Sequence, residues 1–504
     1  MSSFRQYAAI ASGLAALLVA GCRVGPKYQQ PPAMAQAPPA AYKETPAASS
    51  NAGDWKVAQP QDAMLHGKWW EIYNDPELNG LEDKLNIDNQ NIKVYFANFM
   101  EARTLIAQAR AQLFPTLTAA PSFNRSLSSG SLTNASTANT GKESSVTTMG
   151  LDASWAPDLW GKVRNQISEE QYNAQVSEAD LENEKLTEQA TLAITFFEIR
   201  GQDALQAVFD QTIADDQKSL DYTRAQYETG VGTEISVVEA ENTLENAQAA
   251  ATNLGVARAE EEHAIAMLIG TDPSTFNIAV KALNAAPPAV PIGVPSQLLE
   301  RRPDIAASER SMAAANAEIG VATAAFYPAL TLSATGGFES STIGNLFNWP
   351  SRFWSVGASV AQPLFDAGLR RATVNQYIEV YNADVASYRQ TVLGAFQQVE
   401  DYLATERILS QQLVQQQAAA DSARRFVDLE TARYQTGIDP YIDLVTAQET
   451  LLSDQQTLTT LHTQAMTASV ELIEALGGGW DSTQLPTPAQ VTVKMTTAET
   501  TFQK

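Results

Sequence analysis

Four short segments alternate apolar and polar side chains with a period of two residues, which predicts β-strands with one apolar face. In the first segment Leu117, Ala119 and Phe123 alternate with small polar residues such as Thr118 and Ser122. Segments of about ten residues with few charges are typical of membrane β-strands. A water-soluble sandwich with one buried face is the alternative. The four segments are residues 113–127, 149–155, 328–338 and 354–364.

Two further features favour the membrane interpretation. Residues 128–145 and 339–352 are rich in small polar residues and suit loops outside the bilayer. Aromatic side chains lie near the ends of the segments, where an interfacial girdle would be. These residues are Phe114, Trp155, Trp160, Tyr327, Trp354 and Phe365.

Four strands cannot close a barrel, and an open sheet edge is not tolerated in hydrocarbon. Barrels made by a single chain need about eight strands or more. Two copies of this chain would give an eight-stranded barrel whose interior is filled by side chains, and three copies would give twelve strands and an open bore. The hydroxyl-rich polar face favours the bore, so we expect a homotrimer with four strands from each protomer.

Each pair of strand segments is followed by a long stretch without proline, residues 162–228 and 369–435. At about 1.5 Å per residue each stretch predicts a helix of roughly 100 Å, too long for an ordinary globular core. Apolar residues such as Leu192, Phe196 and Ile199 recur at heptad-like spacing, which predicts coiled-coil packing. Shorter helices are expected over residues 76–112, 236–269, 304–325 and 441–476.

The two halves of the chain repeat this order of elements. The tetrapeptide that begins at Tyr227 and ends at Gly230 returns, with one change, from Tyr434 to Gly437. In each half a helix would rise to the membrane, two strands would cross it, a long helix would descend and a glycine turn would reverse the chain. The sequence therefore predicts an α+β membrane channel with an internal duplication, in which a β-barrel is continued by a long α-helical barrel.

The N-terminus has the features of a bacterial lipoprotein signal peptide. Arg5 precedes an apolar run that is too short for a transmembrane helix, and the run ends in small residues before Cys22, the only cysteine. We expect cleavage after residue 21 and acyl chains on Cys22, which would anchor the chain to a leaflet. A signal-region cysteine without a role is the alternative. Arg23, where an aspartate often retains lipoproteins in the inner membrane, favours the outer membrane.

Composition excludes several classes of function. A net charge of -24 argues against nucleic acid as a partner. His66, His263 and His462 are dispersed, and neither metal-ligand spacing nor a nucleophile arrangement is present. We expect no enzyme, no metal site and no cofactor other than covalent lipid on Cys22. Residues 22–60, rich in proline and alanine, predict an extended linker, and residues 481–504 predict a flexible tail.

Several motifs together resemble the outer-membrane factor family, the TolC/OprM/NodT-type exit ducts, in its lipoprotein branch. The most specific runs from Pro295 to Ile305, and it is followed by an alanine-rich segment that ends at Gly320. The resemblance spans roughly residues 22–480. The other motifs are residues 22–28, 69–79, 158–164 and 475–480.

The resemblance implies a homotrimeric duct in the outer membrane of a Gram-negative bacterium, with an equatorial mixed α/β region around the helical barrel. It implies passive export of small molecules together with a periplasmic adaptor and an inner-membrane transporter, commonly of the resistance-nodulation-division class. Strand pairs would occupy residues 113–157 and 326–365, and the periplasmic part residues 61–112, 158–325 and 366–480. A coiled-coil lipoprotein without a pore and a duct for secreted proteins are the alternatives.

The resemblance also places a periplasmic aperture just after the second tip turn, at Ile442, Asp443 and Thr446. Ile442 and Thr446 share a helix face, so each would form a ring of three side chains in a trimer. Apolar rings gate by dewetting, and carboxylate rings favour cations. Asp443 as an ordinary residue at a helix N-terminus is the alternative. The tip-turn glycines Gly230, Gly232 and Gly437 are expected to contact the adaptor.

Overall fold

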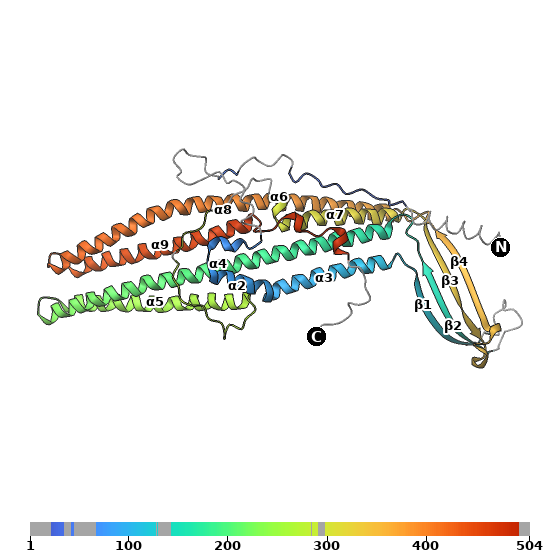
Figure 1. Ribbon diagram of the computed structural model, residues 1–504, viewed down its shortest axis with the longest axis horizontal. Coiled ribbons are helices and arrows are strands. Elements are labelled where there is room, and N and C mark those ends of the chain that lie inside the picture. Colours follow the sequence, from blue (N-terminus) through green and yellow to red (C-terminus); the bar gives the residue numbers. More distant parts are fainter. Residues whose placement is uncertain are drawn as a thin grey trace.

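The computed structural model places a β-sheet at one end of a long helical body (Figure 1). It describes residues 22–34, 42–44, 67–127, 129, 143–283, 285–290 and 298–492. The predicted signal peptide and most of the predicted linker lie outside these residues. Within the described part of the chain, no helix combines the length and apolarity needed to cross a membrane.

The two longest helices have the predicted bounds: α4 is Lys162–Glu228 and α8 is Leu369–Gln435, each of 67 residues. Both begin after a glycine in the left-handed region, Gly161 (φ 78°) and Gly368 (φ 91°). The described residues also form α2 (Pro76–Asp88), α3 (Gln90–Ala111), α5 (Glu234–Leu268), α6 (Leu298–Arg301), α7 (Pro303–Ala324), α9 (Tyr441–Ala475) and α10 (Pro488–Val491). Short 3-10 helices are η2 (Trp69–Tyr73), η4 (Ile343–Asn345), η5 (Trp349–Ser351) and η6 (Ser482–Gln484).

The prediction of one helix over residues 76–112 is wrong, because Asn89 separates α2 from α3. Its ψ of 129° is not helical, and its side chain accepts a hydrogen bond from the backbone N–H of Ile92, which caps α3. The same side chain donates to the Leu268 carbonyl at 2.9 Å and to the Glu188 carboxylate at 3.0 Å. Asn89, at the break between α2 and α3, therefore ties these helices to α4 and α5.

The four predicted strands form one antiparallel sheet in the order β1-β2-β3-β4. The strands are β1 (Thr116–Leu127), β2 (Glu143–Trp155), β3 (Ala329–Ser340) and β4 (Arg352–Ala361). The register places Leu117 opposite Ala153, Ala153 opposite Ala334, and Ala334 opposite Val356, so one face carries the apolar residues of all four strands. β2 begins at Glu143, earlier than predicted, because its polar start pairs with the end of β1.

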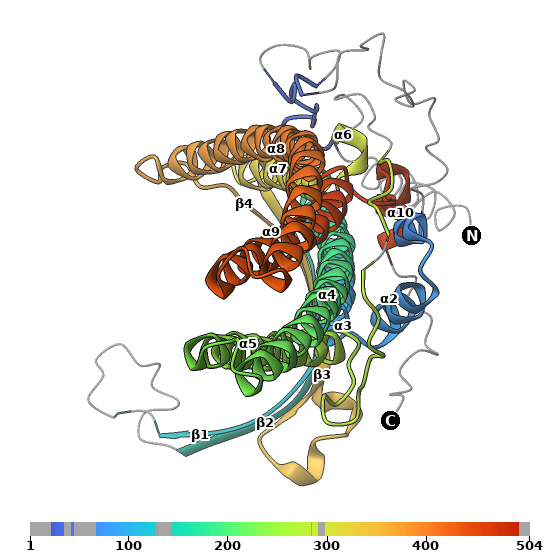
Figure 2. The same ribbon diagram turned by 90° about the vertical axis from the view of Figure 1, so that its left-hand side faces the viewer.

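Seen from the end away from the sheet, the helices stand in a curved row with α8 and α5 at its two edges (Figure 2). α9 contacts both α8 and α4, and α4 contacts α5. Nearer the sheet, α7 takes the place of α9 between α4 and α8, and α3 takes the place of α5 beside α4. The predicted duplication thus produces a wall one helix thick, with a concave and a convex side.

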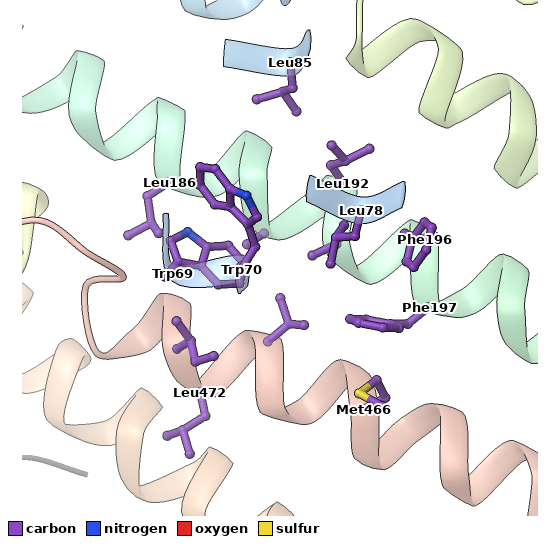
Figure 3. Close-up of a cluster of buried hydrophobic side chains, with 14 of the residues drawn as sticks. Trp69, Trp70, Leu78, Leu85, Leu186, Leu192, Phe196, Phe197, Met466 and Leu472 are labelled. Atoms are coloured by element: carbon purple, nitrogen blue, oxygen red, sulfur yellow. The ribbon is translucent and has the colours of Figure 1, made fainter. Parts of the chain in front are cut away.

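A belt of short elements covers the middle of the convex side (Figure 2). Its core joins η2 and α2 to α4 and α9, and Figure 3 shows Trp69 and Trp70 beside Leu186, and Leu78 near Phe196. Burial of each large apolar side chain contributes about 1.5–3 kcal/mol. In the described residues this belt contains helices and extended loops and no strand, which differs from the mixed α/β region that the resemblance implies.

The predicted flexible tail is folded over residues 481–492. Val491 of α10 is buried in a cluster with Phe99 and Ile106 of α3. On α4, the side-chain amides of Gln171 and Gln175 donate to the carbonyls of Pro488 (3.2 Å) and Pro486 (2.6 Å), respectively. Apolar burial and these hydrogen bonds hold the segment against α3 and α4. Residues 493–504 lie outside the described residues.

Candidate functional site

The sheet has one face suited to lipid and one suited to water. On the apolar face Leu117, Leu151 and Val356 are 71%, 53% and 73% exposed, although they belong to a regular sheet. An apolar surface this continuous needs a lipid or protein neighbour. On the polar face the Thr335 hydroxyl donates to the Asp152 carboxylate at 2.8 Å. Among the described residues, β1 and β4 each leave one edge of the sheet unpaired.

Aromatic residues mark the junction between the sheet and the helices. The indole N–H of Trp155 donates to the Leu113 carbonyl at 2.9 Å, and that of Trp160 donates to the Pro328 carbonyl at 2.8 Å. The Trp160 ring stacks on Tyr327, with 4.8 Å between centroids. Amphipathic rings with satisfied polar atoms are the side chains expected at a membrane interface. This position agrees with the predicted aromatic girdle.

Residues 22–34 form an N-terminal strap that ties Cys22 to this junction. The Val24 backbone N–H donates to the Trp160 carbonyl at 3.0 Å, and the Asn165 side chain returns a 2.9 Å hydrogen bond to the Val24 carbonyl. Farther along, Asn316 of α7 donates to the Pro26 carbonyl at 3.2 Å. Cys22 is exposed beside the sheet, where acyl chains would reach the bilayer. Its acylation stays a prediction.

A glycine-to-glycine contact explains why the strap lies so close to α7. Gly25 has a φ of 115°, which only glycine adopts readily, and a Cβ added there would lie 2.5 Å from the Gly320 Cα. Beyond this contact the Tyr28 hydroxyl donates to the Glu309 carboxylate. The sequence motif that ends at Gly320 therefore has a packing role, which pattern reading did not assign.

The two tip turns have the same backbone hydrogen bonds. Gly230 and Gly437 have φ values of 77° and 71° and follow the last residues of α4 and α8. In the first turn Val231 N–H donates to the Gln226 carbonyl, and in the second Ile438 N–H donates to the Arg433 carbonyl, both at 2.9 Å. This is the Schellman arrangement for ending a helix at glycine. Gly232 lies in the first turn, and contact of these glycines with an adaptor stays a prediction.

The predicted aperture residues share an exposed face of α9. Ile442 is 49% exposed, and Asp443 and Thr446 are also exposed, whereas Leu444 and Val445 are buried. The Thr446 hydroxyl donates to the Ile442 carbonyl of the same helix at 2.9 Å, so its hydrogen-bond donor is satisfied within α9. The structure brings the three residues to one surface at the tip. Their role in gating stays a prediction.

Side-chain hydrogen bonds hold the α8–α9 tip against α4, and sequence reading missed them. The Tyr434 hydroxyl donates to the Gln226 side chain at 2.7 Å, and the Gln448 amide donates to the Ser219 hydroxyl at 3.2 Å. The Tyr434 ring also contacts Tyr222 edge-on at 5.9 Å. In the sequence, the tyrosine that begins both repeated tetrapeptides could have indicated these contacts. We refer to these contacts as the tip latch.

A cavity of about 770 Å³ lies between α4, α8 and α9 next to the tip latch. Asp216 lines it and is only 3% exposed, and its Oδ2 atom has no hydrogen-bond partner among the described residues. Burial raises the pKa of Asp216 from 3.8 to about 6, and the neighbouring Asp215 carboxylate adds to the effect. The folded tip thus makes protonation of this carboxyl easier than it is in water.

We expect Asp216→Asn to stabilise the folded protein at pH 7.5 by about 2 kcal/mol, because it removes a buried charge. A raised pKa contributes stability that is present below about pH 4 and is lost as pH rises through about 6. The stabilising effect should therefore vanish at pH 4. Thermal unfolding of both proteins at the two pH values tests this. An equal difference at both values would contradict it.

Comparison with known proteins identifies the family that this chain is similar to. A family model described as outer membrane efflux protein matches residues 82–271 and 294–478. The solvent efflux pump outer membrane protein SrpC of Pseudomonas putida is 31% identical over 476 residues, which cover 93% of this chain and 98% of SrpC. Outer membrane protein OprJ of Pseudomonas aeruginosa is 29% identical over 484 residues, 94% of this chain and 96% of OprJ.

Among solved structures, the outer-membrane channel OprN superposes with a TM-score of 0.80 at 28% sequence identity. The match covers 91% of this chain and 100% of OprN. The similarity therefore includes the sheet as well as both helical repeats.

Proposed function

Because this chain belongs to the outer membrane efflux protein family and is an outer-membrane exit duct of tripartite efflux, we propose that three copies form one continuous passive channel. The observation that carries the proposal is a four-stranded sheet with two unpaired edges and a continuous apolar face. In hydrocarbon such edges must pair, and β4 of one copy can pair with β1 of the next. The closed ring would have twelve strands and its polar face inside.

The helical wall supports the same assembly. Its concave side faces away from the belt of η2, α2 and α10, which lies on the convex side (Figure 2). Three curved walls joined at their α8 and α5 edges would enclose a tunnel lined by the concave sides. The tunnel would continue the barrel bore into the periplasm. Transport through it requires no chemistry from the duct, so we expect neither catalysis nor a cofactor.

The proposed partners are a periplasmic adaptor at the tip and an inner-membrane transporter, which we expect to be of the resistance-nodulation-division class. Covalent lipid on Cys22 would anchor the duct beside its own sheet. We propose small molecules as the cargo, in keeping with the relative named as a solvent efflux pump. Conductance of the purified protein in planar bilayers tests the channel. Absence of conductance would favour a scaffolding lipoprotein without a pore.

We propose that the tip latch controls opening. The latch joins α8 and α9 to α4 through a few polar contacts, each worth about 0.5–1.5 kcal/mol, so a bound adaptor can exchange them for contacts of its own. Outward movement of α9 would then carry Ile442, Asp443 and Thr446 away from the channel axis. A ring of three carboxylates at the narrowest point would favour cations.

Asp443→Ala is expected to lower the cation-to-anion permeability ratio by about twofold or more, because it removes three charges from the aperture. Reversal potentials in asymmetric salt, measured on single channels, give this ratio. Asp428→Ala, which removes an exposed carboxylate from α8, is the control and should leave the ratio unchanged. Unaltered conductance and ion preference in Asp443→Ala would exclude Asp443 from the gate.

A further inference from the structure

An arginine lies on the apolar face of the sheet, at the end farthest from the helices. Arg352 begins β4, and the register places it opposite Phe338. Trp354, two residues along the strand, points to the same face, because side chains alternate along a strand. Arg352 is exposed in the chain. A charge on a lipid-facing surface is tolerated near the headgroups and is costly at the centre of the bilayer.

The length of the apolar stretch places Arg352 at that border. On β4 the apolar face runs from Val360 to Trp354, about 20 Å at roughly 3.3 Å per residue. Arg352 is a further two residues, about 7 Å, beyond Trp354. Strands of membrane barrels tilt by about 35–45°, so the roughly 27 Å from Val360 to Arg352 along the strand rises about 20 Å across the bilayer, toward the upper border of an apolar band about 25 Å tall. With the helices in the periplasm, the Arg352 guanidinium lies at the level of the outer-leaflet headgroups.

The positive charge of Arg352 is uncompensated among the described residues. Its guanidinium makes no hydrogen bond or ion pair with them, and its central carbon lies 3.6 Å from the centre of the Trp349 ring. Stacking on an aromatic ring fixes the orientation of the guanidinium and leaves its N–H groups available for a planar, bidentate anion. By contrast, Arg125 at the same end of β1 is paired with Glu143.

Exposed apolar side chains surround this free guanidinium. Ile343, Phe347 and Trp349, in the connection between β3 and β4, are 73%, 68% and 74% exposed. The Phe347 ring packs edge-on against Phe338 at 5.6 Å, so the connection is folded onto the lipid-facing side of the sheet. A cation beside apolar groups matches a ligand with a phosphate next to acyl chains.

We propose that Arg352 and the 343–349 connection bind the phosphate and adjoining acyl chains of lipid A, the phosphorylated glycolipid of the outer leaflet. The proposal rests on the orientation of the sheet in the proposed function. Charge complementarity at this point selects the ligand: although the chain has a net charge of -24, Arg352 is a free cation at a phosphate-rich level of the membrane. Binding would fix the depth of the barrel in the bilayer.

The test is titration of lipid A into the detergent-solubilised, acylated protein, with binding followed by native mass spectrometry. Arg352→Gln should weaken binding about tenfold, the loss expected for a charge-assisted hydrogen bond. Lys218→Gln, which removes an exposed positive charge from α4 far from the sheet, is the control and should bind like the wild type. Lipid A stripped of its phosphates should bind the wild type about as weakly as lipid A binds Arg352→Gln.

Three outcomes would overturn the proposal. One is equal affinity of the wild type and Arg352→Gln for lipid A, and another is equal affinity of the wild type for phosphatidylglycerol and lipid A. The third is a fall in the melting temperature of Arg352→Gln that is the same with and without lipid, because this would assign Arg352 to a contact between copies. Conductance of Arg352→Gln in planar bilayers should match the wild type, so a failed lipid test is distinguishable from a failed channel.

Discussion

Val356→Arg is expected to prevent assembly of the channel in the outer membrane. Val356 lies in the middle of β4 on the apolar face, opposite Ala334, and is 73% exposed. An arginine at the bilayer midplane of a membrane barrel costs about 2–4 kcal/mol, and a trimer would carry this cost three times. The amount of oligomer in outer-membrane extracts, separated on gels without heating, should fall to near zero.

Ser355→Arg is the matched control, because it introduces the same charge one residue away. Ser355 lies opposite Thr335 on the polar face, and Thr335 donates to Asp152. The new guanidinium would therefore enter the bore, close to a carboxylate. This variant should assemble like the wild type and show a weaker preference for cations. Equal assembly of both variants would mean that the apolar face does not meet lipid.

Asp203→Ala is expected to destabilise the folded protein by about 3–5 kcal/mol, because it breaks a buried ion network. Asp203 accepts hydrogen bonds from the Arg200 guanidinium (3.3 Å), the Arg258 guanidinium (2.7 Å) and the Lys281 backbone N–H (2.8 Å). Arg200 is 2% exposed and, of its two acidic partners in the described part of the chain, would keep Glu77. The network joins α4 and α5 to the belt, so its loss should loosen the middle of the duct.

The matched control for this network is Asp215→Ala, on the same helix. Asp215 pairs with Lys218, and both side chains are more than half exposed. Such a surface pair is worth about 0–1 kcal/mol. Urea unfolding of the purified proteins measures both effects. A loss in Asp203→Ala no greater than that in Asp215→Ala would contradict a structural role for the buried network.

The long helices could be predicted from the sequence because their limits are local. Proline and glycine punctuate the chain around α4 and α8, and nothing within either stretch interrupts the helix. The strands could also be predicted from the sequence, since the alternation of apolar and polar residues alone assigns each side chain to one face of the sheet. The break at Asn89 was not predictable in this way. It depends on hydrogen bonds to Glu188 and Leu268, which lie far away in the sequence.

In the site, too, features set by the local sequence could be predicted, and contacts between residues far apart in the sequence could not. The tip glycines follow from turn chemistry, whereas the resemblance to the exit ducts indicated Ile442, Asp443 and Thr446. Asp216 and Asp203 are single acids in helices rich in acids, and only the packing of neighbouring helices shows that both are buried. The C-terminal segment looked flexible because its composition is polar. Its anchor, Val491, is buried against Phe99 and Ile106 of α3 and Ala174 of α4, which the sequence did not indicate.

A continuous channel requires that sheets from three copies join edge to edge around a water-filled bore. Electron cryomicroscopy of the acylated protein in lipid nanodiscs tests this most directly. We predict a threefold-symmetric particle in which twelve strands surround a lumen that continues into the helical tunnel. Single chains, or a ring without a lumen through the lipid, would contradict it.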